Sequence, residues 1–392
     1  MPARKPPKLR AAVIEPVGGH GGMDYYDFGL CGGLAEAGVE VTLYTCDETS
    51  PSKASATYAV ALPYRRIYGE APAWLRGLRY VWGSVRALTN ARLRRARIAH
   101  FHFFHVGPLE LFNVIAARLL GLKVVITAHD VQSFVESLSV PWMVERVYQA
   151  ADRVIAQSRV SEEELRTVLH GSAGKVDVIP HGNYLHVIGE VPSREEARAS
   201  LGLPVEGRVL LFFGQIKEVK GLDVLLRAMP RVIRAYPDAI LLIAGKVWKD
   251  DFARYERMIE DLGIRGSCVS HIRYVPDAEV SRYYAAADAV VLPYRRIYQS
   301  GVLLMAMSHA KATVVSDLAG MTETVTDGVE GYSFPAGDAE ALADKLVEAL
   351  SDPEELRLVG ERAHSRARKR HDWGEVGRAT AACYQMTLRA RS

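Results

Sequence analysis

The sequence predicts an α/β protein whose two halves each fold around a doubly wound parallel sheet. Short apolar runs rich in Val, Ile and Leu alternate with longer stretches of helical periodicity, as expected for buried parallel strands joined by helices. The alternation stops at a polar segment around residues 191–206 and then starts again. A chain of 392 residues is also too long for one ordinary core. We therefore expect two domains, residues 1–190 and 191–370.

The expected strands follow in order along the chain. In the first half they are AAVIEPV (11–17), VEVTLYT (39–45), ARIAHFHFF (96–104), LKVVITAH (122–129), RVIAQS (153–158) and VDVIP (176–180). In the second half they are RVLLFFG (208–214), AILLIAG (239–245), AVVLPY (289–294) and ATVVSD (312–317). Pro237 ends one clear helical stretch, and Asp338 can cap another. The last helix follows a complete second domain, so we expect residues 371–392 to pack on the first domain.

The composition is that of a folded, soluble protein and excludes several classes of function. Hydrophobic residues make up 49% of the chain, and its net charge of +3 is too small for a nucleic-acid-binding protein. Four scattered cysteines predict neither a disulfide framework nor a zinc site, and they fit a cytoplasmic protein with reduced thiols. The apolar runs are too short to span a membrane. No H-E-x-x-H, nucleophile elbow or P-loop motif occurs, and no metal ligand set is expected.

Seven residues, LPYRRIY, occur twice, at 62–68 and at 292–298. The first copy ends an early strand of the first domain, whereas the second ends a strand well inside the second domain. These places are not equivalent, so the repeat does not indicate a duplicated unit. Two interpretations remain open. The repeat is either a coincidence at two strand ends, or a shared role for arginine pairs at the edge where ligands of such sheets bind.

Two glycine-containing turns join a strand to a helix and are candidates for binding an anion. Residues 18–30, GGHGGMDYYDFGL, do not have the G-x-G-x-x-G spacing, so an anion site and a merely flexible turn fit equally well. Residues 212–221, FFGQIKEVKG, place Lys217 and Lys220 beside a glycine. These lysines either bind a diphosphate and stabilise its departure or are simply solvated.

A third turn and one strand end add further candidates. In residues 298–310, YQSGVLLMAMSHA, Ser300 and Gly301 precede an apolar helix and offer a second anion nest. His129 ends the strand of residues 122–129, where it either faces a ligand as a hydrogen-bond donor or base or has a structural role. Asp130 beside it is equally open to both interpretations.

Taken together, these stretches resemble the retaining glycosyltransferases of family 4. The resemblance covers nearly the whole chain and rests on the order of its segments, from GGHGGMDYYDFGLCGGLAEAGVEVTLYT through VVITAHD, ADRVIAQS and VIPHGNY to FFGQIKEVKGLDVLLRA, LLIAGKV, YVPDAEVSRYYAAADAVVLPY, QSGVLLMAM and VVSDLAGMTETVTDGVEGYSFPAGD. It implies a GT-B fold, with two facing Rossmann-like domains and a C-terminal helix that crosses back to the first. It also implies sugar transfer from a UDP- or GDP-linked donor to a glycan acceptor, with no catalytic metal or other cofactor.

The resemblance assigns roles to particular residues. Lys217 and Lys220 would stabilise the leaving diphosphate and His129 would line the reacting sugar, so these three are the expected catalytic residues. The expected donor-binding residues are Gly21, Gly22, Gly214, Lys217, Lys220, Gly245, Ser300, Gly301, Val302 and Glu323. The expected acceptor-side residues are Tyr25, His105 and Asp130.

Two positions depart from the family pattern. The family commonly carries two glutamates eight residues apart, the second of which holds the nucleotide ribose, and the matching positions here are Ile297 and Met305. A methionine is a poor partner for a ribose hydroxyl, so either another group such as Glu323 replaces it, or donor binding is altered or lost. The alternative function is therefore a non-catalytic GT-B protein that binds a glycan or a partner transferase.

A basic segment runs from Arg65 to Arg97. It carries nine arginines against one acidic residue, Glu70, and Trp74, Tyr80 and Trp82 are interleaved with them in APAWLRGLRYVWGSVRALTNARLRRAR. Such a segment suits the surface of an anionic membrane, where each nearby cation contributes about 1 kcal/mol. Because the family's first domain receives the acceptor, the resemblance implies a lipid-linked acceptor at the inner membrane face, in exopolysaccharide or cell-envelope biosynthesis. The alternatives are a plain solvated helix and a small soluble acceptor.

Overall fold

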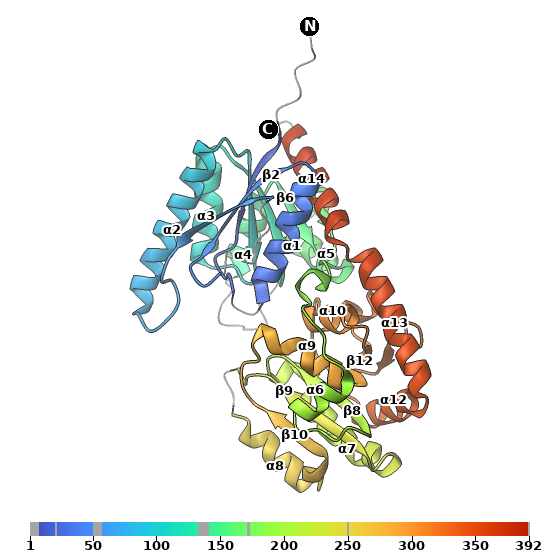
Figure 1. Ribbon diagram of the computed structural model, residues 1–392. Helices are drawn as coiled ribbons and strands as arrows, with labels where there is room; N and C mark the ends of the chain where they lie inside the picture. The colour runs from blue at the N-terminus through green and yellow to red at the C-terminus, as the bar shows by residue number, and fades with distance from the viewer. Residues whose placement is uncertain are drawn as a thin grey trace. The chain divides into compact units, whose positions relative to one another are not determined.

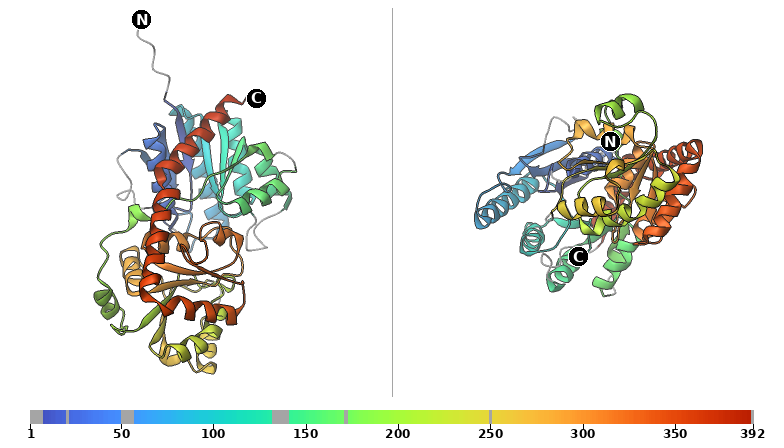
Figure 2. Two further views of the ribbon diagram at one scale, coloured as in Figure 1. Left: turned by 90° about the vertical axis from the view of Figure 1, so that its right-hand side faces the viewer. Right: turned by 90° about the horizontal axis from the view of Figure 1, so that it is seen from below.

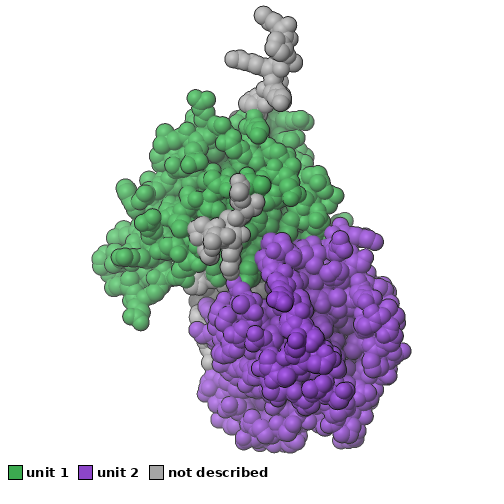
Figure 3. All heavy atoms as spheres, viewed as in Figure 1, with its two compact units in different colours: residues 1–182, 371–392 green, residues 183–370 purple. Residues whose placement is uncertain are grey.

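The chain folds into two compact units, which Figure 3 shows in different colours. The computed structural model describes residues 8–19, 22–49, 57–131, 141–170, 173–248 and 251–390. Unit 1 comprises Met1–Gly182 with His371–Ser392, and unit 2 comprises Asn183–Arg370. The first unit ends before residue 190, the boundary expected from the sequence. The reason is that Asn183 and Tyr184 already bond within unit 2, to the Ala367 carbonyl at 3.2 Å and to the Ser308 hydroxyl at 3.0 Å.

Unit 1 is built on a seven-stranded parallel sheet with the strand order β3-β2-β1-β4-β5-β6-β7. The strand bounds are β1 Arg10–Ile14, β2 Glu40–Cys46, β3 Ala59–Tyr64, β4 Ile98–Phe103, β5 Lys123–Ala128, β6 Arg153–Ala156 and β7 Val176–Val178. The central strands are buried, which explains their near-continuous runs of Val, Ile and Ala. The doubly wound order brings the carboxyl ends of the strands to one edge, where such sheets bind ligands.

Helices cover both faces of this sheet (Figure 1). Their bounds are α1 Met23–Glu36, α2 Ala73–Leu93, α3 Pro108–Leu119, α4 Pro141–Ala150, α5 Arg159–Val168 and α14 Trp373–Arg389, with a short 3₁₀ helix, η3, at Ala173–Lys175. Helices α2, α3 and α4 pack in a row on one face. Helices α1 and α14 pack against each other on the opposite face, as Figure 1 and the left view of Figure 2 show.

The C-terminal helix α14 completes the core of unit 1. The Trp373 ring lies against Gly29 and Gly182, where an added Cβ would meet ring atoms at 2.1 and 2.2 Å. Gly33 and Gly377 also bring the backbones of α1 and α14 into direct contact. The expected packing of the last helix on the first domain is therefore confirmed, and glycines make the close approach possible.

Unit 2 holds a six-stranded parallel sheet with the strand order β10-β9-β8-β11-β12-β13. The strand bounds are β8 Arg208–Phe213, β9 Ala239–Ala244, β10 Cys268–His271, β11 Ala289–Leu292, β12 Ala312–Ser316 and β13 Tyr332–Phe334. Helices α7 and α12 pack together on one face, whereas α9, α10 and α13 contact β8 and β12 from the other. The predicted restart of the strand–helix alternation in the second half is confirmed.

The helices of unit 2 begin and end near the predicted signals. Their bounds are η4 Leu185–Val187, α6 Arg194–Ser200, η5 Glu218–Lys220, α7 Leu222–Ala235, α8 Ala253–Asp261, η6 Arg265–Ser267, α9 Asp277–Ala286, α10 Gly301–Ser308, α11 Ala319–Thr322, α12 Ala339–Ser351 and α13 Pro353–Arg370. Helix α7 ends just before Pro237, and the Asp338 carboxylate accepts the amides of Glu340 and Ala341 at the start of α12.

All four cysteines are free thiols, as the sequence predicts. Within the described ranges, the helices are all too short or too polar to cross a membrane.

Candidate active site

Three expected donor residues meet at the carboxyl edge of the unit 2 sheet. Gly214 follows β8 with φ 103° and Gly245 follows β9 with φ 149°, backbone conformations that favour glycine. A Cβ on Gly245 would lie 1.8 Å from the Gly214 carbonyl oxygen, so the two turns are in direct backbone contact. A Cβ on Gly214 would lie 3.3 Å from a Val302 methyl group. The turns after β8 and β9 therefore pack closely together, and Gly214 lies beside α10.

The two lysines of the neighbouring turn rest on aromatic rings. The Lys217 ammonium lies 5.1 Å from the centre of the Trp248 ring, and the Lys220 ammonium lies 3.7 Å from the centre of the Tyr294 ring. Both lysines are half-buried. A cation over an aromatic face is attracted by the ring quadrupole, which limits where the ammonium moves. The turn that follows Gly214 therefore holds two cations over aromatic rings.

An arginine of the second LPYRRIY segment fixes this lysine turn. The Arg295 amide donates to the Val219 carbonyl at 2.8 Å, and its guanidinium donates to the Glu218 carbonyl at 3.2 Å. The same guanidinium forms a bidentate pair with Asp223 on α7, with both contacts at 2.6 Å. Desolvation raises the pKa of Asp223, but its hydrogen bonds with Arg295 and Arg227 outweigh that effect and hold the pKa below its usual value.

The start of α10 supplies the third part of the donor side. The Ser300 hydroxyl accepts the Leu303 amide at 3.2 Å, so this side chain caps the helix. Gly301 faces the Tyr184 hydroxyl, which would lie 2.7 Å from an added Cβ. The amides at the N-terminus of α10 carry the positive end of the helix dipole, which favours an anion.

The two positions where the family has glutamates lie in the loop before α10 and on α10 itself. Ile297 and Met305 are both half-buried. Gly320 of α11 packs against the backbone carbonyls of Ile297 and Tyr298, so α11 lies beside this loop. Glu323 is exposed at the C-cap of α11. Its role as a ribose partner remains a prediction.

The glycine turn of unit 1 encloses a carboxylate of its own. Gly22 is the N-cap of α1 with φ 79°, and Gly21 lies outside the described residues. The amides of Val17 and Gly18 donate to the two carboxyl oxygens of Glu15, at 2.8 and 2.7 Å. These two amides therefore already hold an internal carboxyl group.

His129 lies in a buried cluster of aromatic rings at the end of β5. Its Nε2 is 3.1 Å from His102 Nδ1, and its ring stacks on Phe104 with a centroid distance of 4.5 Å. Burial is the largest cause that lowers the pKa of His129, to about 3, and the neighbouring His181 and His100 lower it further. Burial therefore favours the neutral imidazole, which can donate or accept hydrogen bonds but carries no charge.

The expected acceptor-side residues are dispersed around the same turns. The Tyr25 ring lies beside Gly22, where an added Cβ would be 3.4 Å from a ring carbon. Asp130 is half-buried directly after His129. His105 is exposed, with its Nε2 3.8 Å from a carboxyl oxygen of Glu110. Their acceptor roles remain predictions.

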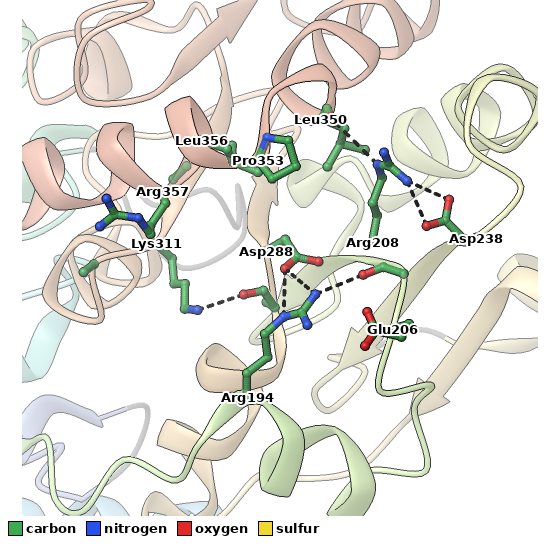
Figure 4. A pocket seen from close by; sticks show the side chains of 14 residues that line it. Arg194, Glu206, Arg208, Asp238, Asp288, Lys311, Leu350, Pro353, Leu356 and Arg357 are labelled. Carbon is green, nitrogen blue, oxygen red and sulfur yellow. Dashed lines mark hydrogen bonds and ion pairs between the residues drawn. The ribbon is translucent and has the colours of Figure 1, made fainter.

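A cavity of about 570 Å³ lies at the opposite edge of the unit 2 sheet (Figure 4). It opens where β8, β11 and β12 begin, away from the lysine turn. Most of its charged groups already bond to one another or to backbone: Arg194 pairs with Asp288 at 3.3 Å, Arg208 pairs with Asp238 at 2.8 Å, and Lys311 donates to the Ala287 carbonyl at 2.9 Å. We therefore do not include it in the candidate site.

Two protein-family models match the chain. The model described as Glycosyltransferase Family 4 matches residues 20–183, and the model described as Glycosyl transferases group 1 matches residues 207–352. Together they match more than half of the chain, in the same order as the two units. The chain belongs to glycosyltransferase family 4. The resemblance inferred from the order of its motifs is thereby confirmed.

Named relatives of this family 4 glycosyltransferase span most of its length. A D-inositol 3-phosphate glycosyltransferase of Segniliparus rotundus is 27% identical, over 99% of this chain and 92% of the relative. A phosphatidyl-myo-inositol mannosyltransferase of Mycolicibacterium smegmatis is 28% identical, over 74% of this chain and 70% of the relative.

Solved structures show that the family 4 chain has the GT-B fold, with two Rossmann-like domains. Sucrose-phosphate synthase from Thermosynechococcus elongatus matches with a TM-score of 0.75 and 20% identity, over 98% of this chain and all of that one. The Anabaena protein HepE, in complex with UDP-glucose, matches with a TM-score of 0.75 and 18% identity, over 96% of this chain and all of that one.

Several supporting residues of the site were missed by sequence reasoning. These are Trp248 and Tyr294 beneath the lysines, and Arg295 and Asp223, which clamp the lysine turn. Two of them, Tyr294 and Arg295, belong to the second LPYRRIY segment, and the repeat of that segment could have drawn attention to them. It indicated a role for its arginines at the strand end, but that role in the second copy is structural support of the turn.

Proposed function

We propose that this chain transfers a sugar, with retention of anomeric configuration, from a UDP- or GDP-linked donor to a glycan-type acceptor. The observation that carries this proposal is the pair of ring-supported ammonium groups, Lys217 and Lys220, beside the Gly214 turn and the start of α10. Cations and helix amides at one sheet edge suit a diphosphate. The name of the HepE complex, which contains UDP-glucose, supports a nucleotide-sugar donor.

The chemistry follows from these charges. As the sugar–phosphate bond breaks, negative charge develops on the diphosphate, and Lys217 and Lys220 stabilise it from positions that are already fixed. The acceptor hydroxyl attacks the sugar carbon on the face from which the diphosphate leaves and passes its proton to the departing phosphate oxygen, so the configuration is retained. The lysines supply the positive charge that a metal ion would otherwise provide. His129, a neutral imidazole, lines the sugar and orients it by hydrogen bonding.

Calorimetric titration with UDP and with GDP tests the donor side. We expect one of the two to bind and Lys220→Ala to weaken that binding. If neither nucleotide binds, the donor site is lost. The alternative of a non-catalytic GT-B protein that binds a glycan or a partner transferase would then replace our proposal. Met305 motivates that alternative, because it stands where the family holds the ribose.

The exposed face of α2 supports a membrane-bound acceptor. Trp74, Leu78 and Trp82 are spaced four residues apart and leave 68%, 59% and 63% of their surface exposed. This spacing places them on one face of the helix. Tyr80 does not belong to this face, because its hydroxyl accepts a hydrogen bond from Asn113 at 2.9 Å and its side chain is half-buried. We call Trp74, Leu78 and Trp82 the α2 stripe.

Exposed arginines lie before, on and after α2, namely Arg65 and Arg66 before the helix, Arg86 one turn after Trp82, and Arg92, Arg94, Arg95 and Arg97 at its C-terminal end. Apolar side chains flanked by cations suit the interface of an anionic bilayer. We propose that this surface brings the enzyme to the inner face of a membrane, where it meets a lipid-linked acceptor in exopolysaccharide or cell-envelope synthesis. The name of the M. smegmatis relative includes a lipid acceptor, whereas that of the S. rotundus relative includes a small phosphate ester.

Flotation with liposomes separates these acceptor classes. We expect binding to anionic vesicles and not to neutral ones, weaker binding at high salt, and loss of binding in the triple variant Trp74→Ser, Leu78→Ser, Trp82→Ser. Tyr274→Ser, which removes an exposed aromatic side chain of unit 2, is the matched control and should bind normally. Equal binding to both vesicle types, or none, would favour a small soluble acceptor.

A further inference from the structure

Two carboxyl groups are buried together beneath the glycine turn of unit 1. Glu15 follows β1 and Asp27 lies in the second turn of α1, and neither has any exposed surface. A buried ionised carboxylate is costly unless donors or opposite charges compensate it. Two such groups in contact therefore need a specific arrangement of protons and donors.

The Glu15 carboxyl holds the backbone of the turn. One oxygen accepts the Val17 amide and the other accepts the Gly18 amide, so the chain wraps around its own side chain. Gly18 has φ 62°, and an added Cβ would lie 2.4 Å from Cys46 Sγ and from Thr49 Oγ1. The turn is packed on both sides and cannot shift without losing these contacts.

Asp27 depends on a proton for its bonding. Among the residues that the structure describes, neither of its oxygens has a donor when both carboxyls are ionised. A hydrogen bond to Glu15 forms once Asp27 is protonated. Burial is the largest cause that raises the pKa of Asp27 well above its usual value, and it also raises the pKa of Glu15, to about 7. One proton between them satisfies both groups.

We propose that Glu15 and Asp27 share one proton and that this proton holds the turn between β1 and α1 in place, which makes Glu15 a positioning residue. The turn leads into Gly22 and Tyr25, so its effect on activity rests on the proposed function. Loss of the proton would leave two buried carboxylates facing each other and would release the turn.

The titratable groups that face Glu15 and Asp27 all favour the protonated form of the pair. They are acids on α1, on β2, and on β3 with the turn after it: Asp24, Tyr26, Cys31, Cys46, Tyr64 and Tyr68. Any of these that ionises adds negative charge near the pair. The folded-state pKa of Glu15 lies above its unfolded value. The contribution of its proton to the free energy of unfolding is therefore fully present below about pH 4.5 and is lost as pH rises through about 7.

The variant Asp27→Asn tests the proposal, because its amide donates to Glu15 at every pH. Thermal unfolding and turnover are measured between about pH 4.5 and 9. We expect the wild-type melting temperature to fall across this range and the Asp27→Asn value to stay flat. Glu36→Gln, an exposed change on the same helix, should keep the wild-type profile. An unchanged alkaline loss in Asp27→Asn would overturn the proposal.

A second measurement does not depend on the variant or on catalysis. Infrared difference spectra of the wild-type protein between about pH 6 and 9 should show a buried protonated carboxyl that is lost at the higher pH. A spectrum without that change would overturn the shared proton even if Asp27→Asn fails to fold. Because neither unfolding nor infrared spectra require turnover, failure of this inference is distinguishable from failure of the proposed function.

Discussion

At the scale of single residues, Lys220 is the group on which the proposed chemistry depends most. Replacing it by alanine removes a cation that the Tyr294 ring holds in place. We expect a loss of about 2–4 kcal/mol in transition-state stabilisation, comparable to the loss of one oxyanion donor. Measuring kcat/KM decides this, with Lys369→Ala, an exposed lysine of α13, as the control. Unchanged turnover would remove Lys220 from the site.

Met305 offers a gain-of-function test at the same scale. It stands on α10 where the family has the ribose-binding glutamate, and it is half-buried. Met305→Glu restores an acceptor for ribose hydroxyls, so we expect a lower Kd for UDP or GDP in calorimetry. Met305→Gln, similar in size but uncharged, controls for shape. Weaker binding in Met305→Glu would show that the pocket has been rebuilt around an apolar side chain.

Residue types were predictable where one local turn decides the chemistry. Lys217 and Lys220 lie three residues apart on one glycine turn, and the sequence alone placed that turn at a sheet edge. The role of Arg295 was left open, because its partner Asp223 lies far away in the sequence and only folding brings the two together. The aromatic rings below the lysines were missed for the same reason.

At the scale of elements, the Arg295–Asp223 clamp ties the lysine turn to α7. We expect Arg295→Ala to lower kcat by roughly tenfold while the fold persists, because the turn loses contacts that position Lys220. Arg295→Lys keeps the charge but not the fork, so its activity should lie between wild type and alanine. Steady-state kinetics and circular dichroism measure the two effects. Wild-type kcat in Arg295→Ala would mean that the turn is rigid without its clamp.

Two glycines of α1 give a matched pair for the helix interface. A Cβ on Gly33 would lie 1.9 Å from the Trp373 carbonyl oxygen of α14, whereas Gly32 faces open space. Both changes to alanine gain about 1 kcal/mol of helix propensity. We therefore expect Gly33→Ala to lower the melting temperature, because backbone cannot yield to the methyl group, and Gly32→Ala to raise it slightly. Equal effects in thermal unfolding would contradict the packing of α14.

The strands and helices were predictable from two patterns. Buried parallel strands appear as continuous apolar runs, and the segments between them show the periodicity of helices. The face that each helix presents was less clear from the sequence. Tyr80 was grouped with Trp74 and Trp82, yet helical spacing separates it from their face, and it packs inward against Asn113. Counting in steps of four would have replaced it with Leu78.

At the scale of the whole molecule, the alternation of strands and helices stops and starts again along the chain. This restart predicted two parallel-sheet units and their order. The family followed from the order of many short motifs, and no single motif was specific enough. Substrate identity depends on a few side-chain contacts at two sheet edges, and relatives at 27% and 28% identity carry different acceptors in their names. Direct biochemistry therefore has to identify the substrates.

The central claim is that this protein cleaves a nucleoside-diphosphate sugar at the lysine turn of unit 2. The most direct measurement is mass spectrometry of reactions with a panel of UDP- and GDP-sugars, with lipid-linked and small soluble acceptors offered in parallel. We predict free nucleoside diphosphate and a glycosylated acceptor from one donor, both strongly reduced in Lys220→Ala. The claim would be contradicted if no donor released a diphosphate, or if release continued at the wild-type rate in Lys220→Ala.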